Sequence, residues 1–162
     1  MTIQIGDTLP NATLINQIGD DVSQIDLAER IKGKRVVIFG LPGAYTGVCS
    51  TSHLPSFIRT ADAFREKGIE EIICVAVNDV RVMNHWGRES GAEAAGILML
   101  SDWDSEFTKS LGLEFSVPAI GFKDRLTRCA MVVNDGTVEV LQFEEDHGVC
   151  TLTAGETLLE ML

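Results

Sequence analysis

The chain has 162 residues, a length typical of one domain with its own core, so a single domain over residues 1–162 is expected. Apolar residues make up 45% of the chain and charged residues 23%, a balance that excludes disordered and fibrous proteins. The formal net charge is −11 at pH 7, and such a negative field repels the phosphates of nucleic acids and anionic lipids. Neither nucleic acid nor a membrane is therefore expected as a partner.

The first part of the chain predicts an edge element, a short helix, a buried strand and a long helix. Residues 1–14 are expected to form an edge hairpin or arm, and a turn then precedes a short helix over residues 23–31. Residues 36–39 form a continuous β-branched and aromatic run, which is typical of a strand buried on both faces. Apolar residues at three-and-four spacing predict a helix over residues 46–67, kinked at Pro55.

The second part of the chain continues this alternation and then changes it. Asp135-Gly136 lies between two apolar runs, where Asp-Gly is the strongest short-range signal for an antiparallel hairpin. Parallel α/β units followed by a hairpin and a final helix predict an α/β thioredoxin-like fold, with a central mixed β-sheet flanked by helices. A flavodoxin-like fold would continue with parallel strands instead. The expected strands cover residues 72–77, 97–100, 129–133 and 137–143, and the expected helices cover residues 80–89, 105–111 after a cap at 101–104, and 153–162.

Four cysteines are the feature that the composition leaves unexplained. No two of them are spaced as C-x-x-C and their spacing to the histidines fits no zinc site, so we expect no metal and no other cofactor. No secretory leader is recognised, and we expect a cytoplasmic protein whose thiols stay reduced. The four are Cys49, Cys74, Cys129 and Cys150.

Cys49 occupies the position where the first buried strand of such a fold passes into its helix. Unpaired backbone N–H groups and the positive end of the helix dipole favour an anion in this first turn, and a thiolate is the anion available. Thr46 lies three residues earlier, where its hydroxyl can point at the sulfur or at an oxygen bound beside it. Pro42 and Gly43 predict a rigid turn that shields the pocket from water. The alternative is that Cys49 is one more buried packing residue.

The string Pro42-x-x-x-Thr46-x-x-Cys49 is similar to the peroxidatic loop of the peroxiredoxins. The wider run PGAYTGVCSTSHLPSF, which begins at Pro42, resembles the peroxiredoxin-5 subfamily, called type II in plants. Further segments resemble the same subfamily in order and spacing, so the resemblance extends over nearly the whole chain. These segments are IICVAVND at residues 72–79, HWG at residues 85–87 and RCAMVVNDGTV at residues 128–138.

The resemblance implies a thiol-specific peroxidase. Cys49 would attack hydrogen peroxide or an alkyl hydroperoxide and become a sulfenic acid, with release of water or an alcohol. The fixed charge of Arg128 would hold the thiolate ionised, whereas the sequence alone is equally compatible with a solvated arginine at a strand end. Thr46 is the other polar member of the site, and Pro42 shields the thiolate. The residues expected around the peroxide are Gly43, Val48 and His53, the last with a helix-packing histidine as the alternative.

The resemblance leaves two routes by which the oxidised enzyme is reset. We favour external reduction by glutathione or glutaredoxin. The alternative is a disulfide between Cys49 and Cys150, reduced by thioredoxin, because some animal members use a cysteine in the C-terminal region. Cys74 matches the second cysteine of the plant-type members, but Cys74 and Cys129 both lie in apolar strands and are expected to pack in the core.

Several further expectations complete this interpretation. Gly47 stands where a proline commonly follows the motif threonine, and a glycine at this position loosens the loop. Tyr45 stands where phenylalanine is frequent.

The resemblance implies a homodimer that pairs through the face around the active-site loop. A redox sensor that signals through oxidation of Cys49 without turnover is the alternative to an enzyme. The acidic run at residues 144–146 is expected to form a solvated turn.

Overall fold

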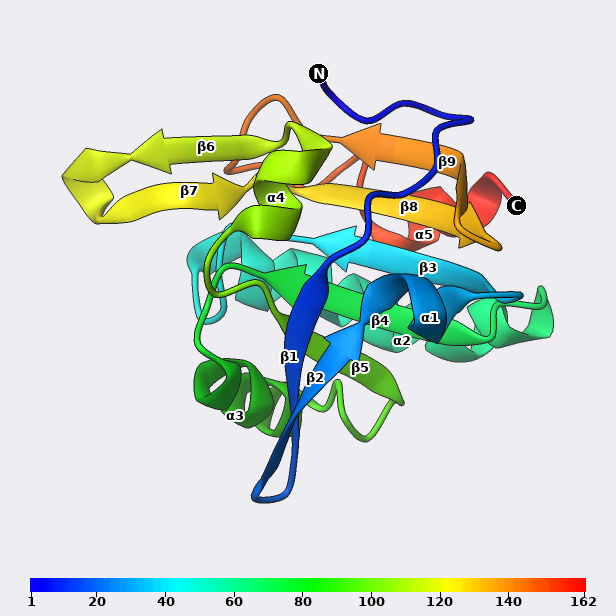
Figure 1. Cartoon of the computed structure of the whole chain (residues 1–162), viewed down its shortest axis with the longest axis horizontal. Coiled ribbons are helices and arrows are strands. Elements are labelled where there is room, and N and C mark those ends of the chain that lie inside the picture. Colours follow the sequence, from blue (N-terminus) through cyan, green and yellow to red (C-terminus); the bar gives the residue numbers. More distant parts are fainter.

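The computed structural model describes residues 1–162 as a seven-stranded mixed β-sheet with helices on both faces (Figure 1). The strands lie in the order β2-β1-β5-β4-β3-β8-β9. Strands β3, β4 and β5 are parallel, and β8 runs antiparallel to β3, which is the thioredoxin-like arrangement expected from the element order. The strands are β1 (Thr13–Ile18), β2 (Asp21–Asp26), β3 (Arg35–Gly40), β4 (Glu71–Ala76), β5 (Ile97–Ser101), β8 (Cys129–Asn134) and β9 (Thr137–Phe143).

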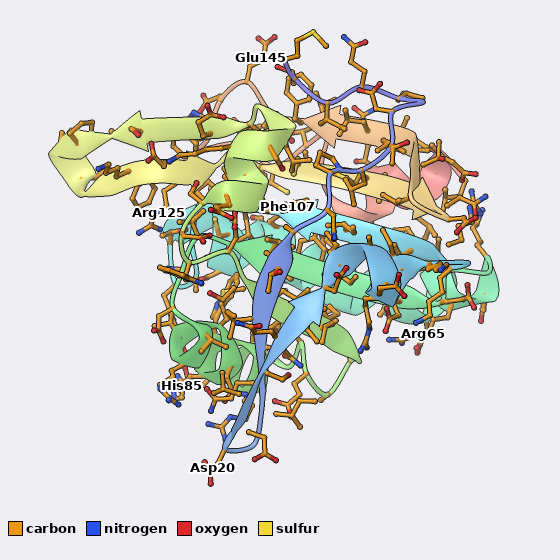
Figure 2. The ribbon with its side chains drawn as sticks, viewed as in Figure 1. Asp20, Arg65, His85, Phe107, Arg125 and Glu145 are labelled. Carbon is orange, nitrogen blue, oxygen red and sulfur yellow. The ribbon has the colours of Figure 1, made fainter.

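Two apolar clusters, one on each face of the sheet, form the core. Residues of β3 contribute alternately to the two clusters, because successive side chains of a strand point to opposite faces. Phe39 packs with α2, α3 and α5, whereas Ile38 packs with α1 and α4. Figure 1 shows α1 and α4 in front of the sheet and α2 and α5 behind it, and Figure 2 labels the buried Phe107 of α4. The helices are α1 (Leu27–Ile31), α2 (Leu54–Glu66), α3 (Val80–Ser90), α4 (Glu106–Leu111) and α5 (Gly155–Glu160).

None of these helices has the length and apolar character that a membrane crossing requires.

The expected hairpin between β8 and β9 is confirmed: Asp135 and Gly136 have φ angles of 46° and 81°, and Asn134 pairs with Thr137. Two consecutive residues with positive φ match the type I′ turn that suits the twist of a hairpin.

The helix expected over residues 23–31 is wrong in its first half. Residues up to Asp26 belong to β2, which pairs along its whole length with β1, and α1 begins at Leu27. The carboxylate of Asp26 accepts a hydrogen bond from the backbone of Glu29 at 3.2 Å and so caps the short helix. Strand pairing with β1, a tertiary interaction, outweighs the local helical pattern here.

The helix expected over residues 46–67 changes type along its length. Residues 47 and 48 are α-helical, Cys49–His53 form a π-helical turn, and α2 then begins at Leu54. Pro55 is the second residue of α2, so the irregularity expected at this proline takes the form of the π-helical turn directly before it. Single π-helical turns are frequent at functional sites.

Strands β6 (Glu114–Val117) and β7 (Phe122–Leu126) form a separate antiparallel hairpin that the sequence pattern does not reveal. Most side chains of both strands are half-buried or exposed, so neither strand contains an apolar run. A 3-10 turn over Pro118–Ile120 joins them, and the hairpin projects beyond the main sheet (Figure 1). It brings Arg125 close to the end of β3.

Gly40, the last residue of β3, is packed too closely for any side chain. A Cβ atom at this position would lie 2.2 Å from Cδ2 of the buried Leu126 and 3.1 Å from Sγ of Cys129. We expect Gly40→Ala to lower the free energy of unfolding by about 1–3 kcal/mol, because overpacking forces side chains or backbone to shift. Urea unfolding checks this value.

The matched control is Gly47→Ala, since a Cβ at Gly47 meets nothing within 4 Å. An equal loss of stability in both variants would contradict the steric explanation.

Candidate active site

Cys49 lies just after β3, in the first turn of the helical segment that leads into α2. Gly47 and the half-buried Val48 begin this turn, and the Cys49 side chain is only 1% exposed. The sulfur belongs to the apolar cluster that also contains Phe39 and Phe57. Cys49 is therefore enclosed by apolar groups at a helix start whose dipole favours an anion.

Arg128 precedes β8, the neighbour of β3, and its guanidinium reaches the sulfur of Cys49. The Nη2 atom donates to Cys49 Sγ at 3.3 Å and to the carbonyl of His147 at 3.1 Å. The Nη1 atom lies 3.1 Å from Nδ1 of His53. Arg128 is 1% exposed, so the alternative of a solvated arginine at a strand end is wrong.

His53 is fully buried and supports the guanidinium in one protonation state. Its Nε2 lies 3.1 Å from the carbonyl of Thr153, which only accepts, and its Nδ1 faces Arg128, which only donates. The proton is therefore on Nε2, and the ring is neutral. Burial, and then the charge of Arg128, lower the pKa of His53 from 6.5 to about 3. The contacts place His53 behind Arg128, as a support for the guanidinium.

The buried guanidinium of Arg128 has no carboxylate within salt-bridge distance. Its acceptors are a sulfur, a neutral imidazole and a carbonyl, and its Nε atom is buried without any partner. A buried cation without a counter-ion is strongly unfavourable. A thiolate at Cys49 would supply the missing negative charge.

The loop of residues 42–48 is held by groups outside it. The hydroxyl of Thr46 donates to the carbonyl of Gly43 at 2.7 Å, which leaves the lone pairs of the oxygen free for another group. The N–H of Ala44 donates to Oδ1 of Asn78, which follows β4, at 2.9 Å. Pro42 is buried beside them. No hydrogen bond joins Thr46 to Cys49, so Thr46 can meet the sulfur only through a bound atom.

The two departures from the subfamily pattern lie in this loop. Gly47 is exposed and has open space around its Cα, so nothing in the structure requires a glycine there. Tyr45 has a φ of 62°, and its hydroxyl hydrogen-bonds to His85 and Glu89 of α3. A phenylalanine could not make these bonds. At position 47 the chain thus has a residue with more backbone freedom. At position 45 it has a side chain that is hydrogen-bonded to α3.

Glu144 corrects the expectation of a solvated turn at residues 144–146. Its side chain is 4% exposed, and Oε1 accepts hydrogen bonds from the N–H groups of Thr151 and Thr153 and from the Thr153 hydroxyl. The carboxylate therefore shapes the loop that presents the carbonyls of His147 and Thr153 to the site. Cys150 lies in the same loop and is half-buried.

Cys74 and Cys129 are core residues, as expected. Cys74 is completely buried in the cluster of α2, and burial raises its pKa well above the usual value, with smaller contributions from Cys49 and Cys129. Cys129 points to the opposite face of the sheet, and burial raises its pKa to about 12. Neither thiol is ionised at neutral pH.

Several residues of the site escape prediction from the sequence. Arg125 donates to the carbonyl of Pro42 at 2.9 Å, from a hairpin that has no sequence signal. Glu144 lies in a run of three acidic residues, where nothing distinguishes the buried carboxylate from its exposed neighbours. Asn78 and His147 act through tertiary hydrogen bonds that only the fold creates.

A cleft of about 410 Å³ lies elsewhere, at the N-terminal ends of β4 and β5. Its arginines are already engaged, Arg30 with Glu71 at 2.6 Å and Arg65 with a backbone carbonyl at 2.6 Å. Cys49 follows the C-terminal end of β3, which is parallel to β4. The cleft therefore lies at the opposite end of these strands and is not part of the candidate site.

The neutral His53 predicts an acid-sensitive fold. The unfolded chain binds a proton near pH 6.5 that the folded chain binds only near pH 3, so stability falls as the pH falls through this window. One such group contributes up to about 1.4 kcal/mol per pH unit. We expect His53→Asn, which carries no titratable ring, to lose less stability than the wild type between pH 7 and pH 4.5, as measured by urea unfolding.

The carboxylates of the chain titrate in both proteins, so the comparison isolates His53. Identical losses of stability in the two proteins would show that His53 is not held neutral.

Comparison with known proteins identifies the family. A family model described as Redoxin matches residues 4–159. The chain is 42% identical over 142 residues to "Peroxiredoxin-2F, mitochondrial" of Arabidopsis thaliana, which covers 88% of this chain and 70% of that protein. It is 39% identical over 165 residues to "Peroxiredoxin-2E-2, chloroplastic" of Oryza sativa subsp. japonica, which covers 99% of this chain and 73% of that protein.

Solved structures agree with this assignment. Reduced Prx3 in complex with H2O2 from Vibrio vulnificus matches with a TM-score of 0.92 and 40% identity over 99% of each chain. Peroxiredoxin 5 from Alvinella pompejana matches with a TM-score of 0.83 and 28% identity over 98% of this chain and 96% of that one. The chain therefore belongs to the peroxiredoxins, the thiol-dependent peroxidases of the Redoxin family, and among them to the peroxiredoxin-5 or plant type II kind.

Proposed function

We propose that Cys49 is the peroxidatic nucleophile and that it reduces hydrogen peroxide and alkyl hydroperoxides to water and alcohols. The observation that carries this proposal is the guanidinium of Arg128, buried without a carboxylate and 3.3 Å from Cys49 Sγ. The relative from Vibrio vulnificus forms a complex with H2O2, which supports hydrogen peroxide as a substrate of this chain.

The reaction follows from the charges at the site. The thiolate of Cys49 attacks the terminal oxygen of the peroxide, so an S–O bond forms and the O–O bond breaks. The sulfur is oxidised to a sulfenic acid, and the departing oxygen takes up from solvent the proton that Cys49 released on ionisation, so that it leaves as water or alcohol. Arg128 stabilises the charge on the departing oxygen, and its unpartnered Nε–H is available to donate to a bound oxygen.

The loop of residues 42–48 supplies the remaining contacts. The proton of the Thr46 hydroxyl is held by Gly43, so Thr46 accepts the O–H of the peroxide and orients it toward the sulfur. Pro42 excludes water from the thiolate. Val48, in the first helical turn, lines the approach to the sulfur. Gly43 fixes Thr46 and leaves the space that a side chain would fill.

We propose that external thiols, glutathione or glutaredoxin, reduce the sulfenic acid. Burial raises the pKa of Cys150, so this thiol is a weak nucleophile at neutral pH. The alternative is a Cys49–Cys150 disulfide reduced by thioredoxin.

Antioxidant turnover in the cytoplasm is the setting that we propose for this chemistry. The four unpaired cysteines suit a compartment that keeps thiols reduced.

We also propose a homodimer that pairs around the active-site loop. Two large side chains are exposed there, Tyr45 in the loop itself and Ile120 at the tip of the β6–β7 hairpin. Sedimentation equilibrium tests the dimer, and a monomer at all concentrations would refute it.

The expected result for Cys49→Ser is complete loss of peroxide consumption with an unchanged circular dichroism spectrum, because a hydroxyl is a far weaker nucleophile than a thiolate. Turnover is measured with excess glutathione and glutaredoxin. The matched control is Cys150→Ser, which keeps turnover if the reductant is external and loses it if Cys150 resolves the sulfenic acid. Wild-type protein that stops after one equivalent of peroxide under these conditions would indicate a redox sensor.

A further inference from the structure

The β6–β7 hairpin places a second arginine against the loop that carries Cys49. Nη1 of Arg125 donates to the carbonyl of Pro42 at 2.9 Å, and its guanidinium carbon lies 4.7 Å from the ring centroid of Phe122. The cation–π contact fixes the side chain above its own hairpin. Figure 2 shows Arg125 at the side of the molecule where β7 faces the segment that follows β3.

The backbone of the loop is shaped to receive this guanidinium. A Cβ on Gly43 would lie 2.6 Å from Nη1 of Arg125 and 3.3 Å from Cγ2 of Thr46. A side chain at position 43 would therefore push the guanidinium away from its place against Pro42. The carbonyl of the same glycine accepts the Thr46 hydroxyl, so the position of residues 42 and 43 determines where the oxygen of Thr46 lies.

The hairpin also contacts the opposite side of the site. Phe115 of β6 stacks on the ring of His147, with centroids 3.5 Å apart and planes at 10°, and packs edge-to-face against Phe122. The carbonyl of His147 accepts a hydrogen bond from Arg128. A continuous row of packed aromatic rings thus links His147, whose carbonyl accepts from Arg128, to Arg125, which holds Pro42.

We propose that Arg125 is a positioning residue of the peroxidase: it holds Pro42 and Gly43 so that Thr46 presents its oxygen beside Cys49. This inference rests on the proposed role of Cys49. Arg125 does not touch the sulfur, which distinguishes it from Arg128. Burial lowers its pKa, whereas the negative charge of Cys49 acts in the opposite direction and favours the cation.

The test compares the rate of reaction with hydrogen peroxide in variants at position 125 with the rate in a variant of the neighbouring Lys123. We expect Arg125→Gln to lower the second-order rate constant of Cys49 with hydrogen peroxide about tenfold, because a charge-assisted hydrogen bond to the loop is lost. Arg125→Lys keeps the charge and one donor and is expected to recover part of the rate. The control is Lys123→Gln, which removes the same charge from an exposed position of β7.

Two further readouts separate positioning from a general structural role. The rate at which iodoacetamide alkylates Cys49 at pH 7, followed by mass spectrometry, is expected to fall less than the peroxide rate, since alkylation does not use Thr46. The midpoint of thermal unfolding is expected to stay near that of the wild type. A peroxide rate within twofold of the wild type in Arg125→Gln, or an equal loss in Lys123→Gln, would overturn the inference.

Gly43→Ala gives an independent arm, because its methyl group displaces the Arg125 guanidinium. We expect it to slow the reaction with peroxide, and Arg125→Gln added to it to cause little further loss. Fully additive losses would contradict a shared role. Wild-type protein whose Cys49 resists oxidation would refute the proposed function, whereas normal oxidation in both wild type and Arg125→Gln refutes this inference alone.

Discussion

The guanidinium of Arg128 is buried without a carboxylate, and the rest of the site is arranged around this charge. Its hydrogen-bond acceptors are Cys49 Sγ, the neutral ring of His53 and the carbonyl of His147. A buried cation is tolerated only when a nearby group balances it. In the proposed mechanism the thiolate of Cys49 provides that balance, so the contact with Arg128 prepares the nucleophile.

This constraint explains why segments distant in sequence must converge on one point. The β3–α2 junction supplies Cys49, the start of β8 supplies Arg128, and β3 and β8 are neighbours in the sheet. The loop after β9 then folds back, organised by the buried carboxylate of Glu144, and its His147 and Thr153 carbonyls accept hydrogen bonds from Arg128 and His53. The net charge of −11 makes local positive charge necessary for an anionic sulfur, while an uncharged peroxide approaches without electrostatic opposition.

The elements predicted correctly are those with local signals. The β3 and β4 runs, the Asp135-Gly136 turn and the position of Cys49 after β3 all depend on short-range patterns, and the structure contains them. The first half of the helix expected at residues 23–31 failed because pairing with β1 is a tertiary effect. Arg125 and Glu144 were beyond prediction for a related reason: their roles come from burial and long-range hydrogen bonds, and nothing in the neighbouring residues marks them.

The most direct test of the central claim is the rate of Cys49 oxidation in Arg128→Lys, measured by stopped flow with hydrogen peroxide. Lysine keeps a positive charge but loses the fork that contacts Cys49, His53 and His147 at once. The expected result is a folded protein whose second-order rate constant falls by about 10²-fold or more, the usual effect of losing one preorganised donor. A folded variant that is oxidised at the wild-type rate would contradict the account.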